Sequence, residues 1–273
     1  MWLMRNMTMK LTSGRKVHRE RGRMFHTVTE LSDWLDREAV AVDNPDGRGP
    51  FVLVCDHASN WVPPSLGGLG LPSSELERHI AWDPGALELA RLLSNLLDAP
   101  LVHATVSRLV LDVNRDPTHP GSVVTRSEDT EIPGNHEITA AERARRVQSI
   151  YEPYHQTLAQ VVSAAPDPSI ISVHSFTPVY RKEPRPWHIG VLSGDDKRLA
   201  HPLLKLLRAD GEFCVGDNQP YAPTDGVYHT LHRHSESRNL RSVLLELRSD
   251  TISSEDGREQ WAARLERALR AIH

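Results

Sequence analysis

Cysteine is scarce in this chain. Among its 273 residues only Cys55 and Cys214 are cysteines, far apart and each in or beside an apolar run. This scarcity excludes a disulfide-stabilised fold and is typical of reduced, buried thiols in a cytoplasmic protein. A nucleophilic pair of Cys55 with His57 is disfavoured, because Cys55 points back into a predicted strand.

A long apolar run is also missing. No stretch approaches the roughly 20 residues of a transmembrane helix, and the opening Met-Trp-Leu-Met is too short for the apolar part of a signal peptide. The net charge of -4 offers no general attraction to nucleic acid or acidic membranes. We therefore expect a cytoplasmic protein without a membrane or nucleic-acid partner.

The first 23 residues differ in charge from the rest. They contain several lysines and arginines, and Glu20 is the only acidic residue among them. Such a segment is typical of a disordered tail, with a basic arm that binds nucleic acid as the alternative. Residues 24–273 show no internal repeat and no clear linker, so we predict a single domain there. The sequence carries no signal for the oligomeric state.

Strand and helix patterns alternate along the chain. Short apolar runs predict strands over residues 51–55, 101–104, 106–113, 170–173, 188–192, 212–215 and 243–247. Amphipathic spacing predicts helices over residues 73–97, 139–164, 199–208 and 254–272. This order predicts an α/β fold of three layers, in which helices flank a central mixed, mostly parallel sheet.

Two of the buried strands end on a histidine. His57 follows residues 51–55 by way of Asp56, and His174 follows residues 170–173. Ligands of parallel α/β sheets bind beyond the carboxyl ends of the strands, and neutral imidazole is a common zinc ligand. The two histidines therefore predict a metal site, although each could instead serve only as a hydrogen-bonding group at a strand end.

A catalytic zinc usually has three protein ligands. Asp83 is the candidate for the third, because it stands at the start of the helical pattern that follows the first strand. It could instead cap the helix that begins at Pro84. Asn60 and Asp56 are the other ligand candidates.

Glu246 is a charged residue within the apolar strand over residues 243–247. A buried carboxylate is costly without a partner, and desolvation raises its pKa. These properties suit a general base that activates water, which is the role we predict. The alternative is an ion pair with Arg248 on the same strand face.

The last part of the run over residues 106–113 is flanked by Arg108, Asn114 and Arg115. The planar guanidinium of arginine matches a carboxylate in two parallel hydrogen bonds, so a substrate with a free carboxylate would explain these arginines. The histidines His229, His232 and His234 fit no metal motif. We predict that they belong to a loop beside the substrate pocket.

Several motifs together resemble the N-formylglutamate amidohydrolase family, along most of residues 50–252. They lie at residues 57–59, 78–86, 107–116, 132–135, 150–155, 173–178 and 245–250. The family in turn resembles zinc carboxypeptidases in fold. There a histidine with a nearby acid, an Asn-Arg pair, a His-Ser pair and a glutamate on a late strand build the site. The corresponding residues here are His57, Asn114, Arg115, His174, Ser175 and Glu246.

The resemblance implies a metal-dependent hydrolase that cleaves the amide of an N-formyl or N-acyl amino acid, such as N-formyl-L-glutamate. It implies a divalent metal, Zn²⁺, held by His57 and His174, and a general base, Glu246. Asp83 remains our candidate for the third ligand, with Asn60 and Asp56 as the alternatives. Arg115 is expected to bind the substrate carboxylate or the oxyanion, with Arg108, Asn114 and Ser175 as further substrate-binding residues.

The chain departs from the pattern at two positions. Asn60 stands where carboxypeptidases supply the acid, and Asp56-His-Ala-Ser replaces a Pro-His-Ser-Gly-like motif. The chain therefore resembles a divergent member. Two alternative functions remain: a metallopeptidase or amidase that acts on peptides, and a non-catalytic ligand-binding protein of the same fold.

Overall fold

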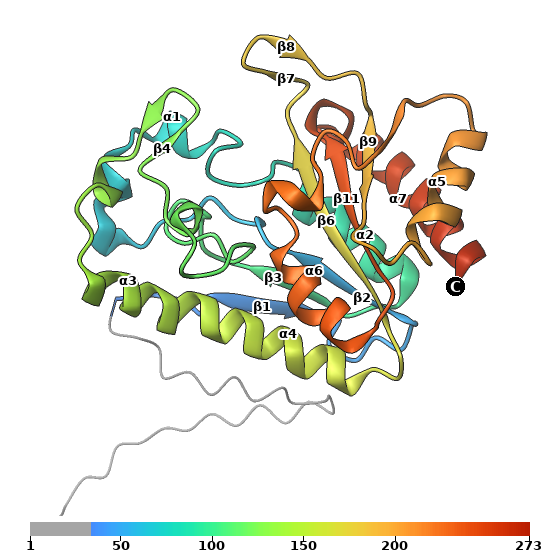
Figure 1. Ribbon diagram of the computed structural model, residues 1–273, viewed down its shortest axis with the longest axis horizontal. Coiled ribbons are helices and arrows are strands. Elements are labelled where there is room, and N and C mark those ends of the chain that lie inside the picture. Colours follow the sequence, from blue (N-terminus) through green and yellow to red (C-terminus); the bar gives the residue numbers. More distant parts are fainter. Residues whose placement is uncertain (1–33) are drawn as a thin grey trace, which may run out of the picture.

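A computed structural model describes residues 34–273 and shows a seven-stranded sheet with helices on both faces (Figure 1). The strands of the sheet are β1 (Val40–Asp43), β2 (Phe51–Cys55), β3 (Leu101–Ala104), β6 (Ser169–Phe176), β9 (Ile189–Leu192), β10 (Val215–Asp217) and β11 (Ser242–Arg248). Two short hairpins lie outside it: β4 (Arg126–Ser127) with β5 (Thr130–Glu131), and β7 (Val179–Tyr180) with β8 (Glu183–Pro184).

The spatial order of the sheet is β1-β3-β2-β6-β11-β9-β10. The four strands from β3 to β11 are parallel, as is the pair of β9 with β10, whereas β1 and β9 run antiparallel to β3 and β11. This confirms the predicted mixed, mostly parallel sheet. The carboxyl ends of β2, β6 and β11 therefore meet at one edge.

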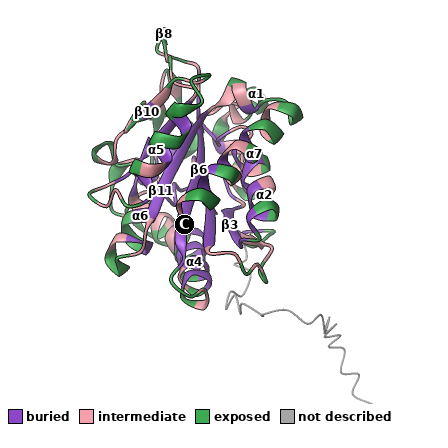
Figure 2. Ribbon diagram, turned by 90° about the vertical axis from the view of Figure 1, so that its right-hand side faces the viewer, coloured by how far each residue is buried: buried purple, intermediate pink, exposed green. Residues whose placement is uncertain are grey.

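The helices are α1 (Ser73–Leu76), α2 (Ala86–Leu97), α3 (Ala140–Arg146), α4 (Glu152–Ala164), α5 (Ala200–Ala209), α6 (His229–His234) and α7 (Glu255–Ile272). Side chains alternate across β2: Leu53 packs in one core cluster with α2, α5 and α7, while Val52 and Val54 pack in the other with α4 and α6. Figure 2 shows the buried strands between these layers. Burial on both faces explains why β2, β6 and β11 are continuous apolar runs.

The predicted helix over residues 139–164 is interrupted. Thr139 caps α3 by accepting a hydrogen bond from the Glu142 amide, and a π-helical turn, Val147–Tyr151, joins α3 to α4. Pro153 at the start of α4 lacks the N–H that would continue the α-helical pattern.

Several sequence predictions are wrong in detail. Residues 106–113 form buried turns rather than a strand, and residues 77–85 separate α1 from α2 within the predicted helix over residues 73–97. The buried Ser107 donates to the Ala81 carbonyl, and the Asp112 amide donates to the Ser122 carbonyl, so this backbone pairs with loops instead of the sheet. His229, His232 and His234, predicted to lie in a loop, belong to α6.

The predicted basic tail of residues 1–23 lies outside the described residues. The division into a tail and a single domain over residues 24–273 stays a prediction.

Candidate metal centre

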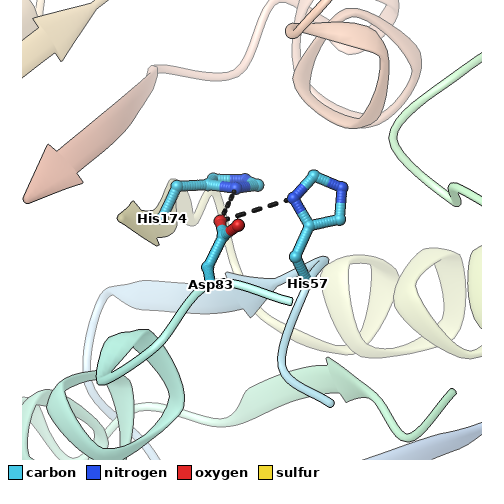
Figure 3. Close-up of side chains that lie close together, drawn as sticks. All are labelled: His57, Asp83 and His174. Atoms are coloured by element: carbon cyan, nitrogen blue, oxygen red, sulfur yellow. Dashed lines mark hydrogen bonds and ion pairs between the residues drawn. The ribbon is translucent and has the colours of Figure 1, made fainter. Parts of the chain in front are cut away.

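Two histidines and an aspartate meet at the carboxyl edge of the sheet (Figure 3). His57 follows β2, His174 lies on β6, and Asp83 precedes α2. The Asp83 amide donates to the His57 carbonyl, which fixes the aspartate beside the end of β2. Helix α2 begins at Ala86 with Gly85 at its N-cap and without a side-chain cap. The Asp83 carboxylate is therefore not a helix cap, and it turns toward the histidines.

The three side chains present one ligand atom each to a common point. Nδ1 of His174 lies 2.8 Å and Nδ1 of His57 lies 3.4 Å from Oδ2 of Asp83, and the three ligand atoms lie within 4.8 Å of one another. All three residues are buried. Ligand atoms around a tetrahedral zinc are about 3.3 Å apart at the usual bond lengths, so the spacing suits such an ion.

Each histidine also contacts a second carboxylate through its Nε2 atom. Nε2 of His57 lies 2.7 Å from Oδ1 of Asp112, and Nε2 of His174 lies 3.1 Å from Oδ2 of Asp56. An imidazole whose Nε2 donates to a carboxylate keeps the lone pair of Nδ1 for a metal, and such partners fix the ring orientation. Asp56, weighed as a ligand from the sequence, therefore orients His174 instead.

The centre strongly attracts positive charge. Burial by itself would lower the pKa of His174, but hydrogen bonds with Asp56 and Asp83 raise it to about 10. Burial raises the pKa of Asp56, but the hydrogen bond and charge of His174 bring it down to about 2. The pKa of Asp112 is also held well below its usual range, because His57 and Arg108 outweigh the effect of burial.

Glu246 faces the same cavity from β11. It pairs in register with His174 on the neighbouring parallel strand, so the two side chains lie on the same face of the sheet. Its Oε2 atom is buried and makes no hydrogen bond within residues 34–273. Burial raises the pKa of Glu246 to about 7, partly offset by the charge of His174. The alternative weighed from the sequence, an ion pair with Arg248, is absent from residues 34–273, where Arg248 pairs with Asp250.

The cavity in front of the triad has a volume of about 150 Å³. Its lining includes every site residue that the sequence indicated: His57, Asp83, Arg108, Asn114, Arg115, His174, Ser175 and Glu246. Asn60 is not among its lining residues. A larger and more open cavity of about 440 Å³ adjoins it and shares Arg115.

The two arginines differ in their contacts. Arg108 donates from Nη2 to Asp112 at 2.8 Å and lies 3.6 Å from Asp83 through Nη1. Arg115 donates from Nη1 to the carbonyl oxygens of Asn114 and Gly226. Arg108 is thus paired with two carboxylates of the candidate centre, whereas Arg115 is held by backbone atoms and keeps donors for another partner.

Asn114 and Ser175 line the cavity, but their side chains are already hydrogen-bonded to other groups of the protein. Asn114 donates to the Val227 carbonyl and accepts from the Thr230 amide, while the Ser175 hydroxyl donates to the Pro84 carbonyl. Both residues hold the walls of the cavity in place. Their binding to substrate stays a prediction.

Sequence reasoning missed the roles of Asp56, Asp112 and two further lining residues, His79 and Tyr221. Asp112 left a signal, because it interrupts the apolar run over residues 106–113 with a charge that the structure buries. Tyr221 left none, since it comes from a polar loop about 110 residues further on.

Comparison with solved structures places the fold among known proteins. A gene product of Agrobacterium tumefaciens is 39% identical, with a TM-score of 0.84 over 86% of this chain and 95% of that one. The N-formylglutamate amidohydrolase from Ralstonia eutropha is 19% identical, with a TM-score of 0.68 over 86% of this chain and 97% of that one. No match was found among curated proteins. None of the helices over residues 34–273 is long and apolar enough to cross a membrane.

The sheet order and the buried cluster define an α/β protein of a hydrolase fold with a candidate metal centre at its carboxyl edge. The family signature of N-formylglutamate amidohydrolase matches residues 49–253, three quarters of the chain. The chain therefore belongs to the N-formylglutamate amidohydrolase family. This confirms the resemblance drawn from the motifs, and the family indicates an amidohydrolase that acts on a small molecule.

Proposed function

We propose that the protein is a metal-dependent hydrolase that cleaves the amide of an N-formyl or N-acyl amino acid, with N-formyl-L-glutamate as the first substrate to test. Family membership supports amide hydrolysis. The observation that carries the proposal is the juxtaposition, in one cavity, of the buried triad His57, Asp83 and His174 with Glu246. The Oε2 atom of Glu246 has no hydrogen-bond partner among residues 34–273. Cys55 is buried as expected, whereas Cys214 is exposed; neither forms a disulfide, and such free thiols support a cytoplasmic location.

The residues present fit a divalent cation such as Zn²⁺. Two imidazoles and one carboxylate are a ligand set of catalytic zinc sites, and the carboxylates behind both histidines match the usual surroundings of such ligands. The carboxylates that contact the two histidines are Asp56, Asp83 and Asp112. With neutral histidines, these three negative charges outnumber the two positive charges of Arg108 and Arg115 beside them, and a cation offsets the excess.

A cation held there would polarise the amide carbonyl and lower the pKa of water. Glu246 has the position of the general base, because its Oε2 atom is free to take a proton from water and to pass it to the leaving amine. Arg115 presents its remaining donors to the substrate carboxylate or to the developing oxyanion. Arg108 holds Asp83 and Asp112 in place.

The first test is Glu246→Gln, which keeps the shape of the side chain and removes its basicity. We expect formate release from N-formyl-L-glutamate, assayed with zinc or cobalt, to fall by at least about 100-fold. Bound metal, measured by elemental analysis, should be unchanged, because Glu246 is not one of the three ligands.

The matched control is Glu88→Gln, which changes an exposed glutamate of α2 and should leave activity unchanged. Full activity of Glu246→Gln would contradict the assignment of the base. A purified protein that neither retains nor regains metal would contradict metal dependence and favour a non-catalytic ligand-binding member of the fold.

The adjoining cavity favours a second candidate, hydrolysis of peptides. Its volume of about 440 Å³ and its shared residue Arg115 leave room for a substrate longer than an acylated amino acid. A panel of N-formyl, N-acetyl and peptide substrates separates the candidates, because only the second predicts the higher kcat/KM for peptides.

A further inference from the structure

The cavity in front of the triad borders on a short hairpin. Strand β6 ends at Phe176, and the chain continues through Thr177 into the hairpin of β7 and β8, beyond the carboxyl edge of the sheet (Figure 1). Phe176 and Thr177 both line this cavity, and so does Tyr221 from the loop after β10. The positions of the hairpin and of Tyr221 therefore determine the size of the cavity on that side.

Arg185 lies among three aromatic rings at this place. Its guanidinium carbon lies 4.5 Å from the centre of the Tyr180 ring, 5.0 Å from that of Tyr221 and 5.6 Å from that of Phe176. A guanidinium at such distances is attracted to the negative faces of the rings. One side chain thus connects β7 with two residues that line the cavity.

The rings are the main partners of the Arg185 charge. No ion pair within residues 34–273 includes Arg185, and its Nη1 atom is buried without a hydrogen-bond partner. Its backbone is fixed on both sides, because its amide donates to the Pro178 carbonyl and its carbonyl accepts from Arg248 of β11. The guanidinium is therefore held between the rings, where it contacts the hairpin and Tyr221 at once.

The hairpin is too short to be stable by itself. Its two strands pair only through Val179 with Pro184 and through Tyr180 with Glu183. Val179 is 53% exposed, and residues 181–184 are all exposed. Isolated two-stranded hairpins are at best marginally stable in water. We therefore expect the contacts of Arg185 to determine where the hairpin lies.

The hairpin borders the part of the cavity that remains for the acyl group of a substrate. Arg115, which the proposed function assigns to the substrate carboxylate, lies where this cavity meets the larger one. Phe176, Thr177 and Tyr221 line the smaller cavity alone. A substrate with its carboxylate at Arg115 and its amide carbonyl at the triad therefore extends its acyl group toward the hairpin.

We propose that Arg185 holds the hairpin and Tyr221 beside the cavity, and that the protein therefore accepts only small acyl groups. The inference rests on the proposed function and names the class of acyl group that the same site takes. The volume of about 150 Å³ is well below the roughly 300–1,000 Å³ of pockets for drug-sized ligands. Arg185 does not line the cavity, so it is a positioning residue.

The test compares N-formyl-L-glutamate with N-benzoyl-L-glutamate, which differ only in the acyl group. For the unmodified protein with bound metal we expect a kcat/KM at least about 100-fold higher on the formyl compound. Arg185→Met keeps the length of the side chain and removes its charge, which frees the hairpin and Tyr221. The ratio of the two kcat/KM values should then fall by about tenfold or more, because the benzoyl compound gains space. Arg185→Lys keeps the charge and should preserve most of the ratio.

Arg181→Gln is the matched control. Arg181 belongs to the same hairpin and lies 5.3 Å from the centre of the Tyr180 ring, but it is exposed and stacks on neither Phe176 nor Tyr221. Its ratio should stay that of the unmodified protein. An unchanged ratio in Arg185→Met, or an equal loss on both compounds, would overturn the inference.

Limited proteolysis tests the position of the hairpin without any substrate. Trypsin cleaves after Arg181 and Lys182, which are exposed in the hairpin, whereas Arg185 precedes Pro186, a bond that trypsin does not cleave. Cleavage after these two residues, followed by mass spectrometry, should be at least about fivefold faster in Arg185→Met than in the unmodified protein. An equal rate in both proteins would contradict the role of Arg185.

A binding measurement distinguishes failure of this inference from failure of the proposed function. Calorimetry on the metal-bound Glu246→Gln protein, with and without Arg185→Met, gives dissociation constants for both compounds without turnover. Tighter binding of the formyl compound that depends on Arg185 supports the inference even if the unmodified protein hydrolyses neither, in which case the proposed reaction alone is refuted. Equal dissociation constants for both compounds would overturn the inference.

Discussion

A histidine has two ring nitrogens, and the partner of one of them fixes the direction in which the other one points. At His57 and His174 that partner is a buried carboxylate, Asp112 and Asp56 respectively, so that Nδ1 of both rings faces Asp83. Asp56 in turn accepts hydrogen bonds from Tyr154 and Thr230, which come from the helices on one face of the sheet. The ligand geometry thus depends on a second layer of residues, none of which would touch the metal.

Asp112→Asn tests this second layer. The change replaces a charge-assisted hydrogen bond to His57 with a neutral one, and such substitutions lower metal affinity by about 10- to 100-fold. The apparent Kd for zinc, measured by competition with a chelator, should rise by that factor while the circular dichroism spectrum is unchanged. Asp250→Asn, which changes an exposed carboxylate paired with Arg248, should leave the Kd as it was. Equal affinities of the two variants would contradict the role of Asp112.

At the scale of elements, the strands that carry the site are anchored by the helices behind them. Leu89 of α2 is fully buried in the cluster that also holds Leu53 of β2 and Leu265 of α7. Leu96 of the same helix is 44% exposed. The two leucines therefore separate the contribution of packing against the sheet from the helical propensity of leucine.

Leu89→Ala should lower the free energy of unfolding by about 2–5 kcal/mol, because it removes buried methyl groups and leaves a cavity. Leu96→Ala should change it by less than about 0.5 kcal/mol. Urea unfolding followed by circular dichroism measures both. A cost at Leu96 as large as that at Leu89 would show that α2 does not pack as described.

The candidate centre joins distant parts of the whole molecule. Asp83 lies 26 residues from His57 and 91 from His174, and the three residues come from different elements. An unfolded chain does not hold them together, so a cation binds the folded state far better and stabilises it.

Removal of the metal should therefore lower the melting temperature. At a free zinc concentration of about 100 times Kd the stabilisation is about 2.7 kcal/mol, which corresponds to about 5–10 °C for a chain of this size. Calorimetry with and without chelator should show this shift in the unmodified protein and in Glu246→Gln. His57→Ala should show little of it, and an undiminished shift in that variant would place the metal elsewhere.

The sequence by itself determined the layers and the residue types that gather at the candidate site. Continuous apolar runs that end in polar residues are typical of strands buried on both faces, which is why β2, β6 and β11 and the residues His57, His174 and Glu246 could be predicted. Predicted element boundaries were least accurate over residues 106–113, where buried apolar residues form turns because polar groups such as Asp112 pair with loops.

Only the tertiary structure decided which groups meet. Local patterns extend over a few residues, whereas Asp83, Asp112 and Asp56 reach the histidines across separations of 26 to 118 residues. The same holds for the pairing of Arg108 with two carboxylates of the candidate centre and for the position of Arg185 against Tyr221. Hydrogen-bond partners of buried charges are chosen by the packing of the whole chain, because burial leaves each charge only the neighbours that the fold supplies.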